Sequence, residues 1–209
     1  MNLDNFFQTQ KIKGFLAHDE GMLLHGYAKK VAQLGPCLEV GSYCGKSSVY
    51  IASACKQNGS ILFALDHHQG SEEHQPGEGY HDSELFDAGS ERMNSFPAFL
   101  HTLRLAGVEN CVVPLVCASQ TLAPHWHQVL GMVFIDGGHS EAQAFYDCQN
   151  WSRHVAEGGY LAIHDIYETP EEGGQAPRLA MQSVVEQGCW QKVAQVKSLV
   201  ILQKNTELP

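Results

Sequence analysis

Four residues that can hold or move protons follow two apolar segments of the chain. Asp136 and His139 follow the segment MVFI, and His164 and Asp165 lie at the end of the segment YLAIH. Both segments are predicted strands. Because neighbouring parallel strands end at one edge of a sheet, the four side chains should converge on one cleft. Histidine titrates near neutral pH and suits a general base. The alternative is that both histidines only hydrogen-bond loop backbone.

A glycine-containing turn with the sequence EVGSYCG, at 39–45, separates a predicted strand from a predicted helix. Gly41 and Gly45 allow a tight turn and the close approach of a ligand. Their spacing, Gly-x-x-x-Gly, differs from the Gly-x-Gly-x-x-Gly of pyrophosphate-binding turns. The next predicted strand ends at Asp66, where a carboxylate can accept both hydroxyl groups of a ribose. Together these features favour a nucleoside-binding site.

A polar, histidine-rich segment follows this strand at 67–82. Its glycine and proline residues predict a long loop or lid beyond the end of the strand. Its residues His68, His74 and His81 are candidates for contact with a substrate. No spacing within the segment matches a structural zinc site. The alternative is a solvated acidic loop that happens to be rich in histidine.

The elements around these residues alternate between strands and helices. Strands are predicted at 37–40, 60–65, 112–118, 132–135 and 160–164, and helices at 20–34, 46–56 and 140–156. Gly158-Gly159 is predicted to separate the last helix from the strand that follows it. The segments VAQV and KSLVILQK predict a final antiparallel pair around Lys197-Ser198. This order predicts an α/β fold with helices around a mostly parallel sheet.

The chain length of 209 residues predicts a single domain, 1–209, with a helical segment at 1–34. A second polar loop, at 167–177, follows the strand that carries His164 and is predicted to border the same site. Seven cysteines, an odd number with no Cys-x-x-Cys pair, favour reduced thiols in a cytoplasmic protein.

The charge balance narrows the range of partners. Lys plus Arg is 13 and Asp plus Glu is 23, which gives a formal charge of −10. This argues against a protein that binds nucleic acid phosphates or an anionic membrane surface. No apolar run approaches the roughly 20 residues that span a bilayer. A small molecule is therefore the expected ligand, and a homodimer is compatible with helices outside the sheet pattern.

The motifs LEVGSYCGKSS, CAS at 117–119, FIDGGHS and GGYLAIHDI, with the strand-end Asp66, resemble class I S-adenosylmethionine-dependent methyltransferases. The first motif is similar to the catechol-type O-methyltransferases. FIDGGHS and GGYLAIHDI look more like the group of macrolide-sugar O-methyltransferases and cephalosporin hydroxylase-like proteins. The resemblance covers about residues 36–204 and implies a Rossmann-like, doubly wound sheet of about seven strands, with helices on both faces.

The resemblance also implies a role for individual residues. Gly41 and Gly45 would line the methionine and ribose of S-adenosylmethionine, and Asp66 would hold the ribose hydroxyl groups. His67 and Ser119 would lie near the adenine. The implied cofactor site comprises Glu39, Gly41, Ser42, Tyr43, Gly45, Asp66, His67, Ser119 and Asp136.

In the macrolide-sugar enzymes, an Asp in the position of Asp136 and an acidic pair after the next strand bind magnesium. The His three residues after that Asp, here His139, is the proposed base. This chain departs from the pattern, because the pair reads His164-Asp165. Magnesium prefers oxygen ligands, whereas manganese, iron, nickel and zinc accept imidazole. Asp136, His164 and Asp165 are therefore candidate ligands for a divalent metal, with magnesium the ion they suit least.

These observations predict an S-adenosylmethionine-dependent methyltransferase that acts on a hydroxyl group or another heteroatom of a small molecule, with metal assistance as an option. His139 and Asp136 are the predicted catalytic residues. One alternative is a metal-dependent hydrolase or hydroxylase-like enzyme that uses the His and Asp cluster on the same scaffold. Another is a non-catalytic module that retains the cofactor pocket.

Overall fold

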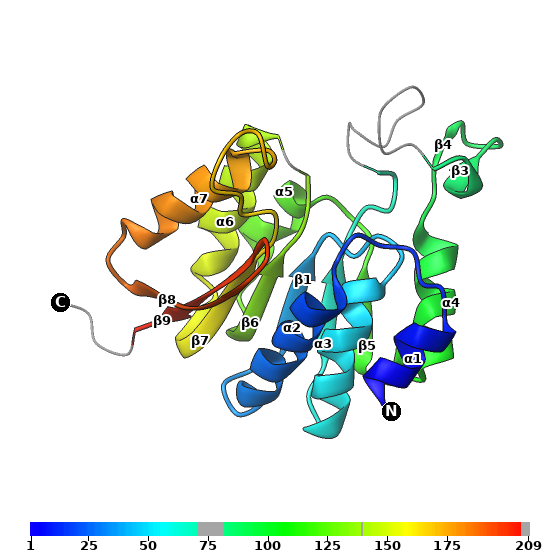
Figure 1. Ribbon diagram of the computed structural model, residues 1–209, viewed down its shortest axis with the longest axis horizontal. Coiled ribbons are helices and arrows are strands. Elements are labelled where there is room, and N and C mark those ends of the chain that lie inside the picture. The colour runs from blue at the N-terminus through cyan, green and yellow to red at the C-terminus, as the bar shows by residue number, and fades with distance from the viewer. Residues whose placement is uncertain (71–81, 139, 206–209) are drawn as a thin grey trace.

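The computed structural model describes residues 1–70, 82–138 and 140–205. Its main sheet has seven strands in the order β5-β2-β1-β6-β7-β9-β8, and β3 and β4 form a separate pair (Figure 1). The strands are β1 (Cys37–Val40), β2 (Leu62–Leu65), β3 (Phe86–Asp87), β4 (Arg92–Met93), β5 (Val112–Leu115), β6 (Leu130–Ile135), β7 (Val155–Ile163), β8 (Trp190–Val196) and β9 (Leu199–Lys204). In the main sheet only β9 runs antiparallel to its neighbours, β7 and β8. The predicted fold class, a doubly wound and mostly parallel sheet with an antiparallel C-terminal pair, is confirmed.

Helices cover both faces of this sheet. The helices are α1 (Leu3–Thr9), α2 (His18–Lys30), α3 (Lys46–Gln57), α4 (Phe96–Ala106), α5 (Ser119–Leu122), α6 (Glu141–Ser152) and α7 (Ala176–Val185). One core cluster joins α1 to α4 to one face of the sheet, and a second cluster joins α6 and α7 to the other face (Figure 1). The N-terminal helices therefore share a core with α3 and α4.

The strand order reverses between β1 and β6. From β1 the chain continues outward through β2 and β5, and it then returns to pair β6 with the other side of β1. In open α/β sheets a ligand crevice lies outside the carboxyl ends of the strands at such a reversal. The register pairs Val40 with Ile135, so Gly41 and Asp136 leave the sheet side by side.

The predicted break at Gly158-Gly159 is wrong, because β7 runs through both glycines. A Cβ atom at Gly159 would lie 2.6 Å from the backbone oxygen of Gly131. The two glycines thus allow β7 to pass close to β6 near a register shift between Leu130 and Met132, and they do not interrupt the strand. The preceding helix, predicted to reach residue 156, ends at Ser152.

The N-terminal segment is helical as predicted but divides into α1 and α2 around residues 10–17. Gly14 lies inside this break with a φ of +146°. The sequence did not predict α4 or α7, and α7 begins within the predicted loop at 167–177. Pro114 lies on β5, at the edge of the sheet, where a proline without an N–H group is tolerated.

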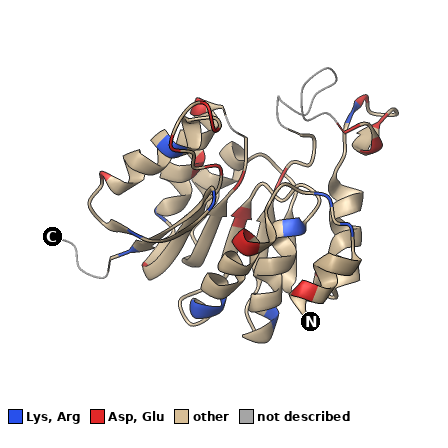
Figure 2. Cartoon of the chain, in the orientation of Figure 1, with Lys and Arg blue, Asp and Glu red and all other residues tan. Residues whose placement is uncertain are grey.

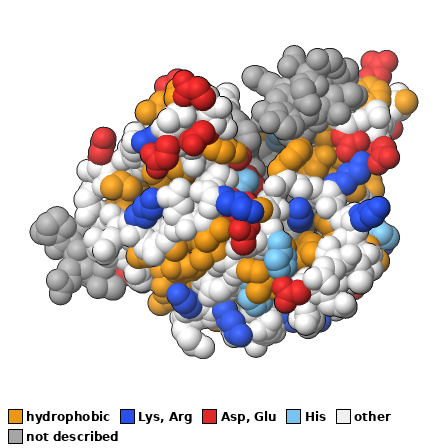
Figure 3. All heavy atoms as spheres, in the orientation of Figure 1, with side chains coloured by type: hydrophobic (Ala, Val, Ile, Leu, Met, Phe, Trp, Pro, Cys, Tyr) orange, Lys and Arg blue, Asp and Glu red, His pale blue; other side chains and the backbone are white. Residues whose placement is uncertain are grey.

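Charged residues lie on the helices and loops around the sheet, and few lie on its strands (Figure 2). Several acidic residues lie on the loop between β7 and α7, beyond the carboxyl ends of the strands. Acidic, basic and histidine side chains also lie next to one another at the centre of the face shown in Figure 3. No helix in the described part of the chain is both long enough and apolar enough to cross a membrane.

Candidate active site

Two cavities meet at the carboxyl ends of β1 and β6. The larger, about 920 Å³, lies between the N-terminal segment, the start of α3 and the loop between β7 and α7. The smaller, about 490 Å³, lies between the ends of β1, β2 and β6 and the start of α5. Both are lined by Gly41, Tyr43, Asp136 and Gly137, so the two cavities meet at the point where the strand order reverses.

Gly41 allows the ends of β1 and β6 to approach each other at this junction. Its φ is +90°, and a Cβ atom there would lie 2.1 Å from the backbone oxygen of Asp136. A side chain at this position would be strained and would also displace the β6 end. Gly45, with a φ of +85°, is the residue before α3 and completes the turn.

Glu39 supports the turn from below and does not line either cavity. Its side chain is fully buried on β1, and the hydroxyl group of Ser48 donates a hydrogen bond to it. Burial raises the pKa of Glu39 to about 7, Asp136 adds a smaller effect in the same direction, and neighbouring serine hydroxyl groups oppose it. Glu39, which the resemblance includes in the cofactor site, therefore lies beneath the turn and outside both cavities.

Asp66 lines the smaller cavity and also fixes the backbone around it. One carboxylate oxygen accepts hydrogen bonds from the backbone N–H groups of Ser42 and Tyr43, at 2.9 and 2.8 Å. The other accepts a hydrogen bond from the N–H group of His68, at 2.7 Å. The residue that was predicted to bind a ribose thus also ties the end of β2 to the glycine turn.

His67 and Ser119 also line the smaller cavity, as the predicted adenine-side residues would. The Ser119 side chain is 7% exposed, accepts a hydrogen bond from the Trp151 indole at 2.8 Å and donates one to Asp147. Burial raises the pKa of Asp147, a residue that the sequence analysis did not single out. This buried network holds α6 against the start of α5.

The remaining predicted histidines differ in position. His68 is 2% exposed, bonds to Ser95 through Nδ1 at 2.8 Å, and packs against the rings of Phe96 and Phe99. It lines neither of the two cavities, so its geometry is that of a packing residue rather than a substrate contact. His74, His81 and the predicted base His139 lie outside the described residues.

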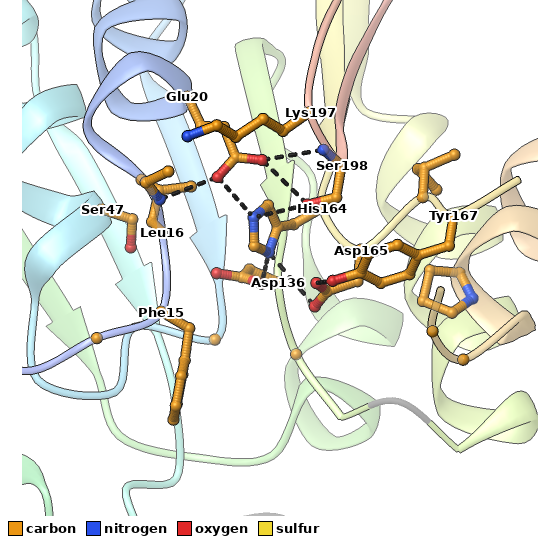
Figure 4. Close-up of a pocket in the computed structure, with 18 of the residues that line it drawn as sticks. Phe15, Leu16, Glu20, Ser47, Asp136, His164, Asp165, Tyr167, Lys197 and Ser198 are labelled. Carbon is orange, nitrogen blue, oxygen red and sulfur yellow. Dashed lines mark hydrogen bonds and ion pairs between the residues drawn. The ribbon is translucent and has the colours of Figure 1, made fainter. Parts of the chain in front are cut away.

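His164 lies between two predicted partners at the floor of the larger cavity (Figure 4). Its Nδ1 atom is 3.0 Å from an Asp136 oxygen and 3.3 Å from an Asp165 oxygen. One potential ligand atom from each residue lies within 4.8 Å of the others. The predicted convergence of Asp136, His164 and Asp165 is therefore present, with the Tyr167 hydroxyl group donating a 3.0 Å hydrogen bond to Asp165.

Glu20, which was not among the predicted site residues, is the fourth member of this group. Its carboxylate lies 3.3 Å from Nε2 of His164 and accepts hydrogen bonds from the backbone and hydroxyl groups of Ser198, at 3.1 and 3.0 Å (Figure 4). It also accepts a 2.9 Å bond from the N–H group of Ala17, where α2 begins. The capping pattern could have placed Glu20 in the first turn of a helix, but nothing local links that helix to His164.

Electrostatics within this group favour a charged ring on His164. Burial lowers its pKa, but Asp136, Asp165 and Glu20 together more than reverse that effect and leave the pKa raised. Burial raises the pKa of Glu20, while its hydrogen bonds to His164 and Ala17 bring the net pKa below its ordinary value. His164 is therefore held by carboxylates on both sides of its ring.

The same geometry fits a divalent metal. An imidazole nitrogen and two carboxylate oxygens would face the ion, while Glu20 would accept the hydrogen bond of the other ring nitrogen. Metal-binding histidines commonly have such a carboxylate partner, which fixes the ring tautomer. A mixed nitrogen and oxygen set suits manganese, iron, nickel or zinc better than magnesium.

Residues 38–166 match a family described as a methyltransferase domain. Three solved structures with the same fold are the O-methyltransferase NovP, cofactor-bound Rv0187 from MTB, and the O-methyltransferase TomG from Streptomyces achromogenes in complex with SAM. NovP is 14% identical with a TM-score of 0.65, covering 87% of this chain and 79% of that chain. Rv0187 is 15% identical with a TM-score of 0.68, and the coverage is 98% and 88%. TomG is 14% identical with a TM-score of 0.63, and the coverage is 98% and 99%.

The family match spans more than half of the chain and contains the glycine turn, Asp66, Asp136 and His164. The solved structures have TM-scores of 0.63 to 0.68 with this chain but only 14 to 15% identity, so they establish the fold alone. The protein belongs to the methyltransferase domain family, and its fold is that of the class I S-adenosylmethionine-dependent methyltransferases.

Proposed function

We propose that the protein uses S-adenosylmethionine to methylate a hydroxyl group, or another heteroatom, of a small molecule. The observation that carries this proposal is the junction of two cavities at Gly41, Tyr43, Asp136 and Gly137. Transfer of a methyl group requires a donor and an acceptor that approach in line. Two cavities that share a short wall at the strand reversal suit that requirement.

The smaller cavity is the proposed site of the adenosine group. Asp66 would accept the ribose hydroxyl groups, while His67 and Ser119 would border the adenine. Gly41 lets the ligand approach the backbone, because a side chain there would meet Asp136. The bound cofactor would supply an electrophilic methyl group. Ser42, Tyr43 and Gly45 would hold it next to the larger cavity, with Glu39 supporting the turn from below.

The larger cavity is the proposed acceptor site. Asp136 lines both cavities and would orient the acceptor atom toward the methyl group. His164 and Asp165 would hold the acceptor from the floor of the cavity (Figure 4). A hydroxyl acceptor must lose its proton, and His139 remains the base that the sequence predicts. His139 lies outside the described residues.

A divalent metal at Asp136, His164 and Asp165 is part of this proposal. When bound, such an ion would lower the pKa of an acceptor hydroxyl group. The ligand atoms of the three residues already face one another, and Glu20 supports the His164 ring. The nitrogen donor favours manganese, iron, nickel or zinc over magnesium.

The net charge supports a small-molecule acceptor rather than a macromolecule. The formal charge of −10 disfavours nucleic acid phosphates as partners.

We propose that residues 1–209 form one domain, because α1 and α2 belong to the core cluster of α3 and α4. Seven free cysteines, most of them buried, support a cytoplasmic protein. A homodimer remains a proposal that sedimentation would test.

Titration calorimetry with S-adenosylhomocysteine tests the cofactor site. We expect micromolar binding to the metal-stripped wild-type protein, and about 10- to 100-fold weaker binding to Asp66→Ala, which loses a charged acceptor. Asp87→Ala is the matched control, because Asp87 also accepts a hydrogen bond from a backbone N–H group two residues later but lies outside both cavities. Absent binding to the wild-type protein, with and without divalent metals, would contradict the proposal.

Metal analysis and a screen for methyl acceptors, together with this titration, separate the two alternatives. A metal-dependent hydrolase or hydroxylase-like enzyme would retain tightly bound iron or zinc and would not bind S-adenosylhomocysteine. A non-catalytic module would bind it, yet it would methylate no acceptor in a broad metabolite screen. The family match favours the methyltransferase over both.

A further inference from the structure

The charges on the wall of the larger cavity are unevenly paired. Three lysines line it: Lys13, Lys46 and Lys197. Lys13 forms ion pairs with Asp82 and Glu84, at 2.5 and 2.6 Å, and Lys197 forms one with Asp19 at 2.8 Å. Within the described residues, the ammonium group of Lys46 contacts no carboxylate, and its hydrogen bond goes to the backbone oxygen of Gly14 at 3.1 Å.

The acids of the same wall are already engaged. Glu20, Asp136 and Asp165 surround His164. Glu168 forms an ion pair with Arg178 at 3.1 Å, and Glu172 accepts hydrogen bonds from two backbone N–H groups at 3.1 and 3.2 Å. Lys46 is therefore the lysine of this cavity whose charge the described part of the protein leaves unmatched.

The position of Lys46 is fixed by its neighbours. It is the first residue of α3, directly after the glycine turn, and it lines the larger cavity but not the smaller one. Gly14 packs against its aliphatic chain so closely that a Cβ atom at Gly14 would lie 2.8 Å from the Lys46 Cβ. Burial lowers the pKa of Lys46, and the negative charge of Glu20 opposes that effect. A bound anion would recover the stabilisation that burial removes from this charge.

We propose that Lys46 binds a carboxylate group of the molecules that fill the larger cavity. The proposal rests on the proposed function, because it takes the larger cavity as the place where cofactor and acceptor meet. Two sources of the carboxylate share this chemistry. One is the amino-acid end of S-adenosylmethionine, which would extend past the turn toward α3, and the other is an acidic group on the acceptor. A charge-assisted hydrogen bond to a half-buried ammonium group suits either source.

Binding measurements with two nucleosides test the first source. S-adenosylhomocysteine carries the amino-acid carboxylate, whereas 5′-methylthioadenosine has the same nucleoside and thioether without it. If Lys46 holds the cofactor carboxylate, Lys46→Met should weaken the binding of S-adenosylhomocysteine about 10- to 100-fold. The affinity for 5′-methylthioadenosine should stay within about twofold of the wild-type value. Lys46→Arg, which retains the charge, should recover most of the affinity.

A second pair of probes tests the acceptor, in protein saturated with S-adenosylhomocysteine. 4-Hydroxybenzoate and 4-hydroxybenzyl alcohol share a phenol ring, which suits the aromatic residues Phe15, Tyr43 and Tyr167 of the cavity wall, but only the first is an anion. If Lys46 holds an acceptor carboxylate, Lys46→Met should leave the affinity for S-adenosylhomocysteine unchanged. It should weaken the binding of 4-hydroxybenzoate by a similar factor, but not that of 4-hydroxybenzyl alcohol.

The matched control is Lys56→Met, at the other end of α3. Lys56 also donates a hydrogen bond to a backbone oxygen, that of Gly107 at 2.6 Å, but lines neither cavity. We expect it to leave all four affinities unchanged. The proposal is overturned if Lys46→Met binds all four probes as the wild-type protein does. Wild-type protein that fails to bind S-adenosylhomocysteine would instead contradict the proposed function.

Discussion

Glu39 illustrates how position determines the chemistry of a single side chain. Its carboxyl group is fully buried under the turn, and burial raises its pKa to about 7 from an ordinary value of 4.5. The unfolded chain releases this proton near pH 4.5, whereas the folded protein retains it to about pH 7. Between these values the folded state binds more protons, so its free energy of unfolding falls as pH rises.

Glu39→Gln should remove this pH dependence. The free energy of unfolding that the wild-type protein loses between pH 4.5 and 7 through this group is on the order of 3 kcal/mol, because one pKa unit corresponds to about 1.4 kcal/mol. Relative to wild type, the free energy of unfolding of the variant should therefore rise as the pH increases from 4.5 to 7. The difference between the two proteins should be constant at higher pH. Urea unfolding at pH 5, 6, 7 and 8 measures the effect. Glu157→Gln, at an exposed position of β7, is the control, and equal pH slopes in all three proteins would contradict the assignment.

The histidines show the limit of residue type as a guide. His68 and His164 are both buried, at 2% and 6% exposure, and both follow a strand. His68 packs against Phe96 and Phe99, whereas His164 lies among three carboxylates. The sequence predicted a site role for each. It could not separate them, because the difference lies in which helix or strand packs against each ring.

At the scale of elements, α2 and the β8–β9 turn jointly hold the site. Glu20 lies in the first turn of α2, where it caps the helix through Ala17, and its carboxylate reaches both His164 and Ser198. Ser198 lies between β8 and β9, so one side chain joins the N-terminal helix to the last hairpin. The segment outside the family match, before residue 38, thus supplies part of the site.

Glu20→Ala should be strongly destabilising. It leaves the buried ring of His164 and the half-buried Ser198 and Ala17 without their acceptor, and we expect a loss of about 2 to 4 kcal/mol in the free energy of unfolding. Asp19→Ala is the neighbouring control, because Asp19 is exposed and its ion pair with Lys197 contributes little. Urea unfolding of both variants at pH 7 measures the difference. Similar stabilities of the two variants would contradict the linking role of Glu20.

At the scale of the whole molecule, the proposed metal site depends on segments far apart in the chain. Asp136 follows β6, His164 and Asp165 follow β7, and Glu20 comes from α2. The parallel pairing of β6 and β7 brings the first three together. The packing of α2 against α3, near the end of the sheet, then brings Glu20 onto the His164 ring.

Removal and replacement of metal tests this assembly. Chelator-treated protein should bind Mn²⁺ more tightly than Mg²⁺ in calorimetry, because His164 would contribute a nitrogen ligand. Asp165→Asn should weaken Mn²⁺ binding by at least about tenfold through loss of a charged ligand. The exposed residue Asp87, outside both cavities, provides the control variant Asp87→Asn. The metal part of the proposed function fails if Mn²⁺ does not bind, or if the two variants bind it equally.

The sequence by itself determined the sheet, the glycine turn and the strand-end acids. Continuous apolar runs and short turn signals are local, so the strands that position Gly41, Asp66, Asp136 and His164 could be predicted. The same signals misplaced the start of β7, since Gly158 and Gly159 serve close packing against β6 rather than a break.

Tertiary structure alone decided which side chains share a cavity. Glu20 and Ser198 lie on separate elements and meet only because α2 and the β8–β9 turn pack at the same edge of the sheet. Lys13 and Lys197 likewise form ion pairs with acids of other segments, whereas no carboxylate among the described residues contacts Lys46. Burial, ion pairing and the shared wall of two cavities are properties of contacts between distant segments. Local sequence carries strand and helix propensity but not those contacts.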